Sequence, residues 1–216
     1  MKSNHCIRFL MIWMVLFVCI SDQKGLSQSE QDVYQKPVSQ KREHSTLFGF
    51  TLGNTRPASE RFKEVYGNIG VMTGIEISHF FPLIQNSSLG ISLEIRGMAK
   101  AGQSTISRQN TLLSMNPITV TGRYILKKGV LRPFLGTGLD IFLYKEQSSL
   151  GDHSGAAGGF HLEGGVYCHP PLFDMISIKA GVRWTRAVAQ EDSIKVNLGG
   201  LEFGLGILLC FEIKKN

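Results

Sequence analysis

The stretch IKVNLGGLEFGLGILLCFEI, from Ile194 to Ile213, decides the fold class. From Leu201 onwards an apolar side chain stands at every second position, and mostly Gly and Glu stand between them. This period of two is typical of a β-strand, whose side chains alternate between the two faces of a sheet. Before Gly199 and Gly200 the apolar positions fall in the opposite phase, which we interpret as a β-bulge that absorbs one extra residue.

Seven segments upstream show the same alternation. One face of each is apolar, and the other carries Gly, Ser, Thr and charged residues. The segments are Thr46–Gly53, Gly70–Ile77, Leu89–Lys100, Ile118–Tyr124, Leu135–Leu143, Phe160–Tyr167 and Ile176–Thr185. With the closing stretch they predict eight strands.

Alternation alone leaves open which face of the sheet is buried. A soluble barrel of the lipocalin type would bury the apolar face. Two observations favour the reverse: the strands match the roughly nine to eleven residues that cross a bilayer at a tilt, and Gly on the polar face makes room inside a narrow barrel. We therefore expect an all-β protein, an eight-stranded antiparallel up-and-down transmembrane β-barrel. The alternative is a soluble exported barrel that binds a small apolar ligand.

The predicted connections alternate between long and short. The longer ones cover residues 54–66, 101–114, 147–157 and 187–193, and the shorter ones cover 82–88, 127–129 and 170–174. Outer-membrane barrels pair long outer loops with short periplasmic turns, and an even number of strands leaves both termini in the periplasm. The order of the connections fits this arrangement.

The start of the chain predicts export. Lys2 and Arg8 accompany a run of 12 apolar residues from Phe9 to Ile20. This run is shorter than the roughly 20 residues of a membrane-spanning helix, and small residues follow it, so we expect a signal peptide over residues 1–27. We expect a flexible periplasmic leader over 28–45, the barrel over 46–213 and a tail over 214–216, with the protein located in the cell outer membrane.

The polar face of the predicted strands would fill the lumen with charge. Its members are Glu76, Glu94, Arg96, Lys100, Arg123, Asp140, Glu163, Lys179, Arg183, Glu202 and Glu212. Because acids and bases nearly balance, and eight strands enclose just enough space for side chains, we expect a network of ion pairs that makes the barrel solid. A narrow porin-like channel for ions or small solutes is the alternative.

Composition and motifs point to no enzyme. Hydrophobic residues make up 43% and charged residues 19% of the 216, which is too apolar for a disordered chain. The net charge of +6 is too mild and scattered to indicate nucleic-acid binding. The sequence holds no phosphate-binding, zinc-protease or nucleophile-elbow motif, so we expect no catalytic residues, no metal site and no cofactor. His79, His161 and His169 lack metal-ligand spacing, and we interpret them as isolated polar residues.

Four stretches resemble the small outer-membrane β-barrels of the OmpA/OmpX type. PASERFKEVYG (Pro57–Gly67) resembles the first outer loop of that family, LRPFLGTGLD (Leu131–Asp140) its fifth strand, GFHLEGGVY (Gly159–Tyr167) its Gly-rich sixth strand, and NLGGLEFGLGILLCF (Asn197–Phe211) its closing strand. Such barrels usually end on an aromatic residue, whereas here Phe211 is followed by five more residues. This departure concerns how assembly is signalled.

The resemblance implies fold and location more firmly than activity. It implies an integral outer-membrane protein with a structural or surface-interaction role through its outer loops. The partners it implies are outer-membrane lipid and the barrel-assembly machinery, with an extracellular partner that the sequence does not identify.

Overall fold

The computed structural model describes residues 44–84, 86–104, 108–127, 129–149, 151–170, 173, 175–191 and 194–213. The predicted signal peptide (1–27), leader (28–45, apart from His44 and Ser45) and tail (214–216) lie outside the described residues. The strands themselves run from His44 to Ile213.

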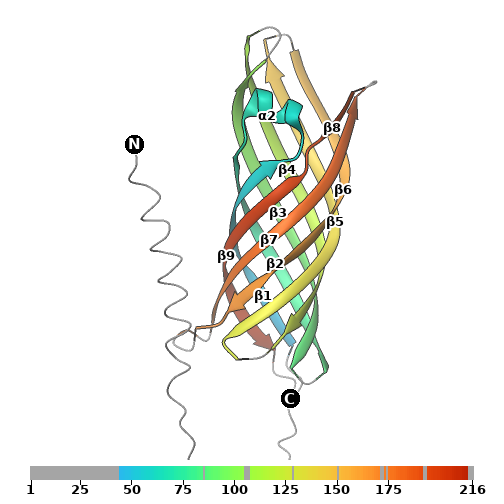
Figure 1. Cartoon of the computed structure of the whole chain (residues 1–216). Coiled ribbons are helices and arrows are strands. Elements are labelled where there is room, and N and C mark those ends of the chain that lie inside the picture. Colours follow the sequence, from blue (N-terminus) through green and yellow to red (C-terminus); the bar gives the residue numbers. More distant parts are fainter. Residues whose placement is uncertain are drawn as a thin grey trace, which may run out of the picture. The chain divides into compact units, whose positions relative to one another are not determined.

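The described residues form one antiparallel sheet that closes on itself. In chain order its strands are β1 (His44–Pro57), β2 (Gly70–Ile84), β3 (Ser87–Gln103), β4 (Asn110–Leu126), β5 (Leu131–Ser148), β6 (Gly151–Cys168), β7 (Ile176–Glu191), β8 (Ile194–Asn197) and β9 (Gly200–Ile213). From β1 to β7 each strand pairs with the next, β7 pairs with both β8 and β9, and β1 pairs with β9 from His44↔Ile213 to Pro57↔Gly200, which closes the ring (Figure 1). β8 and β9 both pair with β7, so together they occupy one strand position in the ring. The ring therefore has eight strand positions, and the predicted eight-stranded up-and-down barrel is confirmed.

The barrel is apolar outside and polar inside over most of its height. Outward side chains such as Leu139 and Ile207 are 70% and 64% exposed, whereas the inward Glu76 and Arg123 are 0% exposed. The outward set includes members of every long strand, among them Phe50, Ile75, Ile91, Val120, Leu162 and Val182. The predicted faces of the strands are therefore correct. No helix in the described part of the chain is long and apolar enough to cross a membrane.

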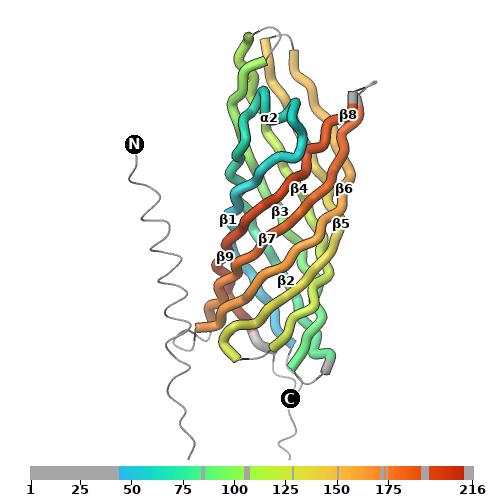
Figure 2. Tube along the Cα trace, viewed as in Figure 1, coloured from blue at the N-terminus to red at the C-terminus, as the bar shows by residue number. Residues whose placement is uncertain are grey.

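The strands extend well beyond their predicted ends. The long strands have 14 to 18 residues. The expected loop over 101–114 is shortened, because β3 continues to Gln103 and β4 begins at Asn110; the expected loop over 147–157 is reduced to the turn between Ser148 and Gly151. The prediction of long irregular loops at these two places was wrong. The polar and small residues there continue the sheet as a wall (Figure 2).

The expected β-bulge at Gly199 and Gly200 is also absent. Val188 pairs with Asn197 and Trp184 with Leu201, so the same number of residues separates the two pairs on each side. What changes at the glycines is the face that is apolar. After the two glycines in the chain, Leu201 points outward and is 37% exposed. Before them, Leu198 points inward and is 9% exposed.

One helix, α2 (Glu60–Tyr66), connects β1 to β2 at the end of the barrel away from the chain's last strand residues (Figure 1). Ser59 caps it: its hydroxyl accepts a hydrogen bond from the backbone N–H of Phe62 at 3.4 Å. Gly67 ends it with φ of 78°, a conformation that glycine adopts without strain. This short amphipathic segment is part of what was expected to be an outer loop.

Candidate functional site

The interior of the barrel holds a chain of side chains with alternating charge. It runs from Glu202 on β9 through β3, β7, β6, β4 and β2, and back to β7. The members in order are Glu202, Arg96, Glu94, Arg183, Glu163, Arg123, Glu76 and Lys179. The four acids balance the four bases, and no side chain among them is more than 12% exposed. The network links residues more than 100 positions apart.

Arg123 lies at the centre of this network. Its guanidinium donates to the carboxylates of Glu76 and Glu163, to the Tyr167 hydroxyl at 2.9 Å and to Ser78 at 3.2 Å. Lys179 donates to the other oxygen of Glu76 at 2.6 Å. Each buried charge therefore has an opposite charge in contact, which is the condition for keeping it ionised away from water.

Arg183 joins the two halves of the network. Its guanidinium donates to Glu94 at 2.6 Å and to Glu163 at 2.8 Å. Glu94 also accepts from the Thr51 hydroxyl at 2.8 Å. Because these donors come from different strands, the ion pairs fasten opposite walls of the barrel to one another.

Eight of the eleven predicted lumen residues form this network, and the other three are Lys100, Asp140 and Glu212. Lys100 lies near the α2 end of the barrel, where its ammonium donates to the Ile69 carbonyl, so its predicted place in the lumen network was wrong. Asp140 belongs to a second, smaller cluster. The side chain of Glu212 lies outside the described residues.

That second cluster is a hydrogen-bonded chain of Asp140, His161 and two threonines. His161 Nδ1 lies 2.9 Å from Asp140 Oδ2, and its Nε2 lies 3.1 Å from the Thr121 hydroxyl. Thr119 donates to the other Asp140 oxygen at 2.8 Å. The prediction that His161 is isolated was therefore wrong. Hydrolase triads place a hydroxyl, an imidazole and a carboxylate in this order. Here each of these side chains is 2% exposed or less, so a substrate in the solvent would not reach them.

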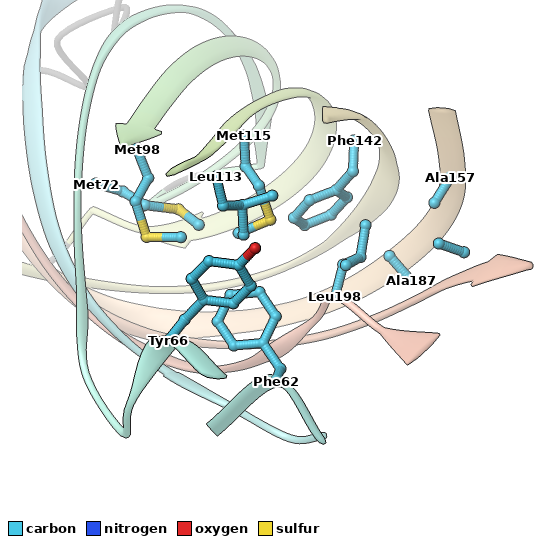
Figure 3. Packing of buried hydrophobic residues seen from close by; sticks show 11 residues of the cluster. Phe62, Tyr66, Met72, Met98, Leu113, Met115, Phe142, Ala157, Ala187 and Leu198 are labelled. Carbon is cyan, nitrogen blue, oxygen red and sulfur yellow. The ribbon is translucent and has the colours of Figure 1, made fainter. Parts of the chain in front are cut away.

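An apolar layer, which we call the outer layer, closes the end of the lumen at which α2 lies. Phe62 and Tyr66 of α2 point into the barrel and pack against inward residues of the strands, as Figure 3 shows. The strand residues of this cluster are Met72, Met98, Leu113, Met115, Phe142, Ala157, Ala187 and Ala189, and Leu198 joins them from the link between β8 and β9. The sequence pattern suggested an interior that is polar throughout. The structure shows instead that this part of the interior is apolar.

The Tyr66 hydroxyl is the main polar group within that layer. It lies 3.1 Å from the Thr111 hydroxyl, which donates to Glu146 at 3.0 Å. Burial raises the pKa of Tyr66 above its ordinary value, and the neighbouring Glu146 carboxylate raises it further, so the phenol keeps its proton.

A second apolar cluster closes the opposite end. It consists of Leu47, Phe80, Ile125, Phe134, Tyr167, Leu208 and Cys210. The Phe134 ring lies under the charged network, with Arg123 Cζ 5.6 Å and Lys179 Nζ 5.8 Å from its centroid. The described lumen thus has three layers, two apolar ones with a charged one between them. No group of three or more potential metal ligands occurs among the described residues.

Solved structures resemble the barrel, although no family model and no curated protein sequence matches the chain. Outer membrane protein OprG from Pseudomonas aeruginosa superposes with a TM-score of 0.51 at 10% identity, over 79% of this chain and 96% of that one. Ail, the attachment invasion locus protein of Yersinia pestis, gives 0.49 at 12% identity, over 79% and 99%. Neisserial surface protein A gives 0.46 at 12%, over 80% and 97%. At these identities the likeness to OprG shows the fold alone.

Proposed function

We propose that the chain is an integral outer-membrane barrel with a closed lumen, non-enzymatic, which acts as a structural or surface protein. One observation carries the proposal: large apolar side chains cover the outside of a closed sheet whose inside holds paired charges. In water such an exterior would be a large exposed apolar patch, whereas in a bilayer it contacts lipid chains. OprG, whose fold this chain shares, is itself an outer membrane protein.

The positions of the chain ends and of α2 are compatible with an outer-membrane location. Both ends of the described barrel, His44 and Ile213, pair with one another at the same end of the sheet, and α2 lies at the other. We therefore place α2 outside the cell and the ends of the sheet in the periplasm. The partners we propose are outer-membrane lipid and the barrel-assembly machinery.

A closed lumen favours this proposal over a narrow channel. The network charges have partners in the described lumen, and apolar layers lie above and below them. An ion that entered would have to displace charge-assisted hydrogen bonds, such as that from Lys179 to Glu76 at 2.6 Å.

We expect the folded protein to show no steady conductance in planar bilayers, because the three layers fill the lumen. The measurement uses full-length protein whose migration on an unboiled gel shows the compact folded form. The matched control is the double variant Phe62→Ala with Tyr66→Ala, which removes the rings of the outer layer. The charged layer remains in this variant, so we expect it to block ions as well. Regular channels of uniform size in the unaltered protein would contradict the closed barrel and support the porin alternative.

A further inference from the structure

Two arginines point outward from the wall of the barrel towards its α2 end. Arg56 is the last outward residue of β1 before Pro57, and Arg186 lies on the outward face of β7, opposite Phe160 of β6. Both arginine side chains are exposed. Within the described part of the chain, neither of them forms an ion pair or a hydrogen bond with a carboxylate.

The two arginines lie on either side of the glycine pair Gly199–Gly200. A Cβ on Gly199 would lie 3.0 Å from Arg186 Cα, and a Cβ on Gly200 would lie 2.1 Å from the Arg56 carbonyl oxygen. β1 and β7 are the two neighbours of β9, so their main chains are about 10 Å apart, twice the spacing of adjacent strands. Because the glycines place no side chain between them, the two guanidinium groups can reach the same anion.

The outer surface beside the arginines is apolar. Trp184 lies two residues before Arg186 on the same face of β7, and it pairs with Leu201, which also pairs with Arg56. Trp184 is 42% and Leu201 37% exposed. Tryptophan is enriched where the acyl chains of a bilayer meet the headgroups. The arginines therefore lie where an apolar surface ends and the headgroup level would begin.

Carboxylates of the protein are directed elsewhere. Most acids of the described strands point into the lumen, and the exposed Asp152 is paired with Lys145 at 3.0 Å. A guanidinium group binds phosphate through two parallel hydrogen bonds, more strongly where water is partly excluded. At the edge of a bilayer, the anion available to Arg56 and Arg186 is then the phosphate of a lipid.

We propose that Arg56 and Arg186 together bind the phosphate headgroup of an anionic lipid whose acyl chains lie along Trp184 and Leu201. The inference rests on the proposed outer-membrane location, and it adds one defined lipid site to a surface that otherwise contacts acyl chains without selection.

The fluorescence of Trp184 reports which lipid lies beside the arginines. In a Trp13→Phe variant it is the single tryptophan. The full-length variant is folded into phosphatidylcholine vesicles that contain the same small fraction of either phosphatidate or phosphatidylcholine with brominated acyl chains, which quench tryptophan on contact. We expect brominated phosphatidate to quench as strongly as roughly five times its mole fraction of brominated phosphatidylcholine, because basic residues attract anionic lipid.

Two variants locate the site. Arg56→Gln with Arg186→Gln should make the two brominated lipids equally effective, whereas Arg61→Gln, which removes an exposed base from α2, should leave the preference unchanged. Gel mobility shows that each variant is folded. A preference that survives the double substitution, or that Arg61→Gln also removes, would overturn the proposal.

The outcomes separate this inference from the proposed function. Equal quenching by the two lipids in the unsubstituted arginine background would overturn the lipid site and leave the outer-membrane location standing. Absence of quenching by either lipid would contradict both. Added inorganic phosphate should not reduce the preference more than sodium chloride of the same ionic strength; a specific loss in phosphate would overturn the lipid as occupant and assign the site to the free anion.

Discussion

Replacing Arg123 by methionine is expected to lower the free energy of unfolding by about 3–5 kcal/mol, as for other buried pairs that lose one partner. The side chain is 0% exposed and holds both Glu76 and Glu163. Its loss leaves one more acid than base in a layer closed at both ends by apolar clusters. Urea unfolding in lipid vesicles, followed by gel mobility and far-ultraviolet circular dichroism, measures the change.

Lys145→Met is the matched control, because it removes a base from an exposed pair. Lys145 and Asp152 lie 3.0 Å apart with side chains 50% and 52% exposed, so water screens them and we expect no resolvable loss. Adding Glu163→Gln to Arg123→Met should restore part of the stability, because it removes the extra acid while Glu76 keeps Lys179 and Arg183 keeps Glu94. Equal effects of Arg123→Met and Lys145→Met would contradict the role of the charged layer.

The second large effect is expected at Gly138. A Cβ there would lie 2.0 Å from the Val120 carbonyl oxygen and 2.8 Å from Thr121 Cα, which are backbone atoms of the neighbouring strand. Gly138→Ala must therefore push β5 away from β4 or distort both. We expect a loss of about 3 kcal/mol, at the upper end of the effects of overpacking.

Gly158→Ala makes the same chemical change where the space is open. A Cβ at Gly158 meets no atom within 4 Å. We expect this variant to keep the stability of the unaltered protein or to gain up to about 1 kcal/mol, because alanine restricts the unfolded chain. Both variants are compared in the same urea titration. If Gly138→Ala is as stable as Gly158→Ala, the close approach of β4 and β5 is wrong.

The sequence alone was sufficient to predict which residues of the barrel wall face outward and which face inward. The period-two pattern identified the outward residues, such as Leu139 and Ile207, and the inward ones, such as Glu76 and Arg123. That pattern is local, because each strand displays its own two faces. The closure of β1 against β9 followed from the need to pair every backbone group in lipid.

The contents of the lumen were less predictable, because their partners lie far apart in the chain. His161 is 21 positions from Asp140, and spacing alone gave no sign that they touch. The phase change at Gly199 was visible in the sequence but was assigned to a bulge. It marks instead where the apolar residues change from the outward to the inward face of the sheet, so that Leu198 faces the apolar layer around α2. An inward apolar residue near a strand end, together with an amphipathic segment such as Ser59–Tyr66, was the signal for that layer.

The arrangement explains the glycine content as well. Many of the 24 glycines lie where a neighbouring strand or a long lumen side chain comes close. At Gly53, for example, an added Cβ would lie 2.5 Å from the Glu202 carboxylate oxygen. Space for the charged network is thus provided by residues without side chains.

The most direct test of the central claim, that the apolar face of the barrel contacts lipid, uses Trp184. This residue points outward, is 42% exposed and packs edge-on against Phe160 with ring centroids 5.6 Å apart. In a Trp13→Phe variant it is the one remaining tryptophan. After folding into vesicles, its fluorescence should be quenched by lipids brominated on their acyl chains and protected from aqueous iodide. Strong quenching by iodide with no effect of brominated lipid would contradict the account and indicate a barrel that faces water.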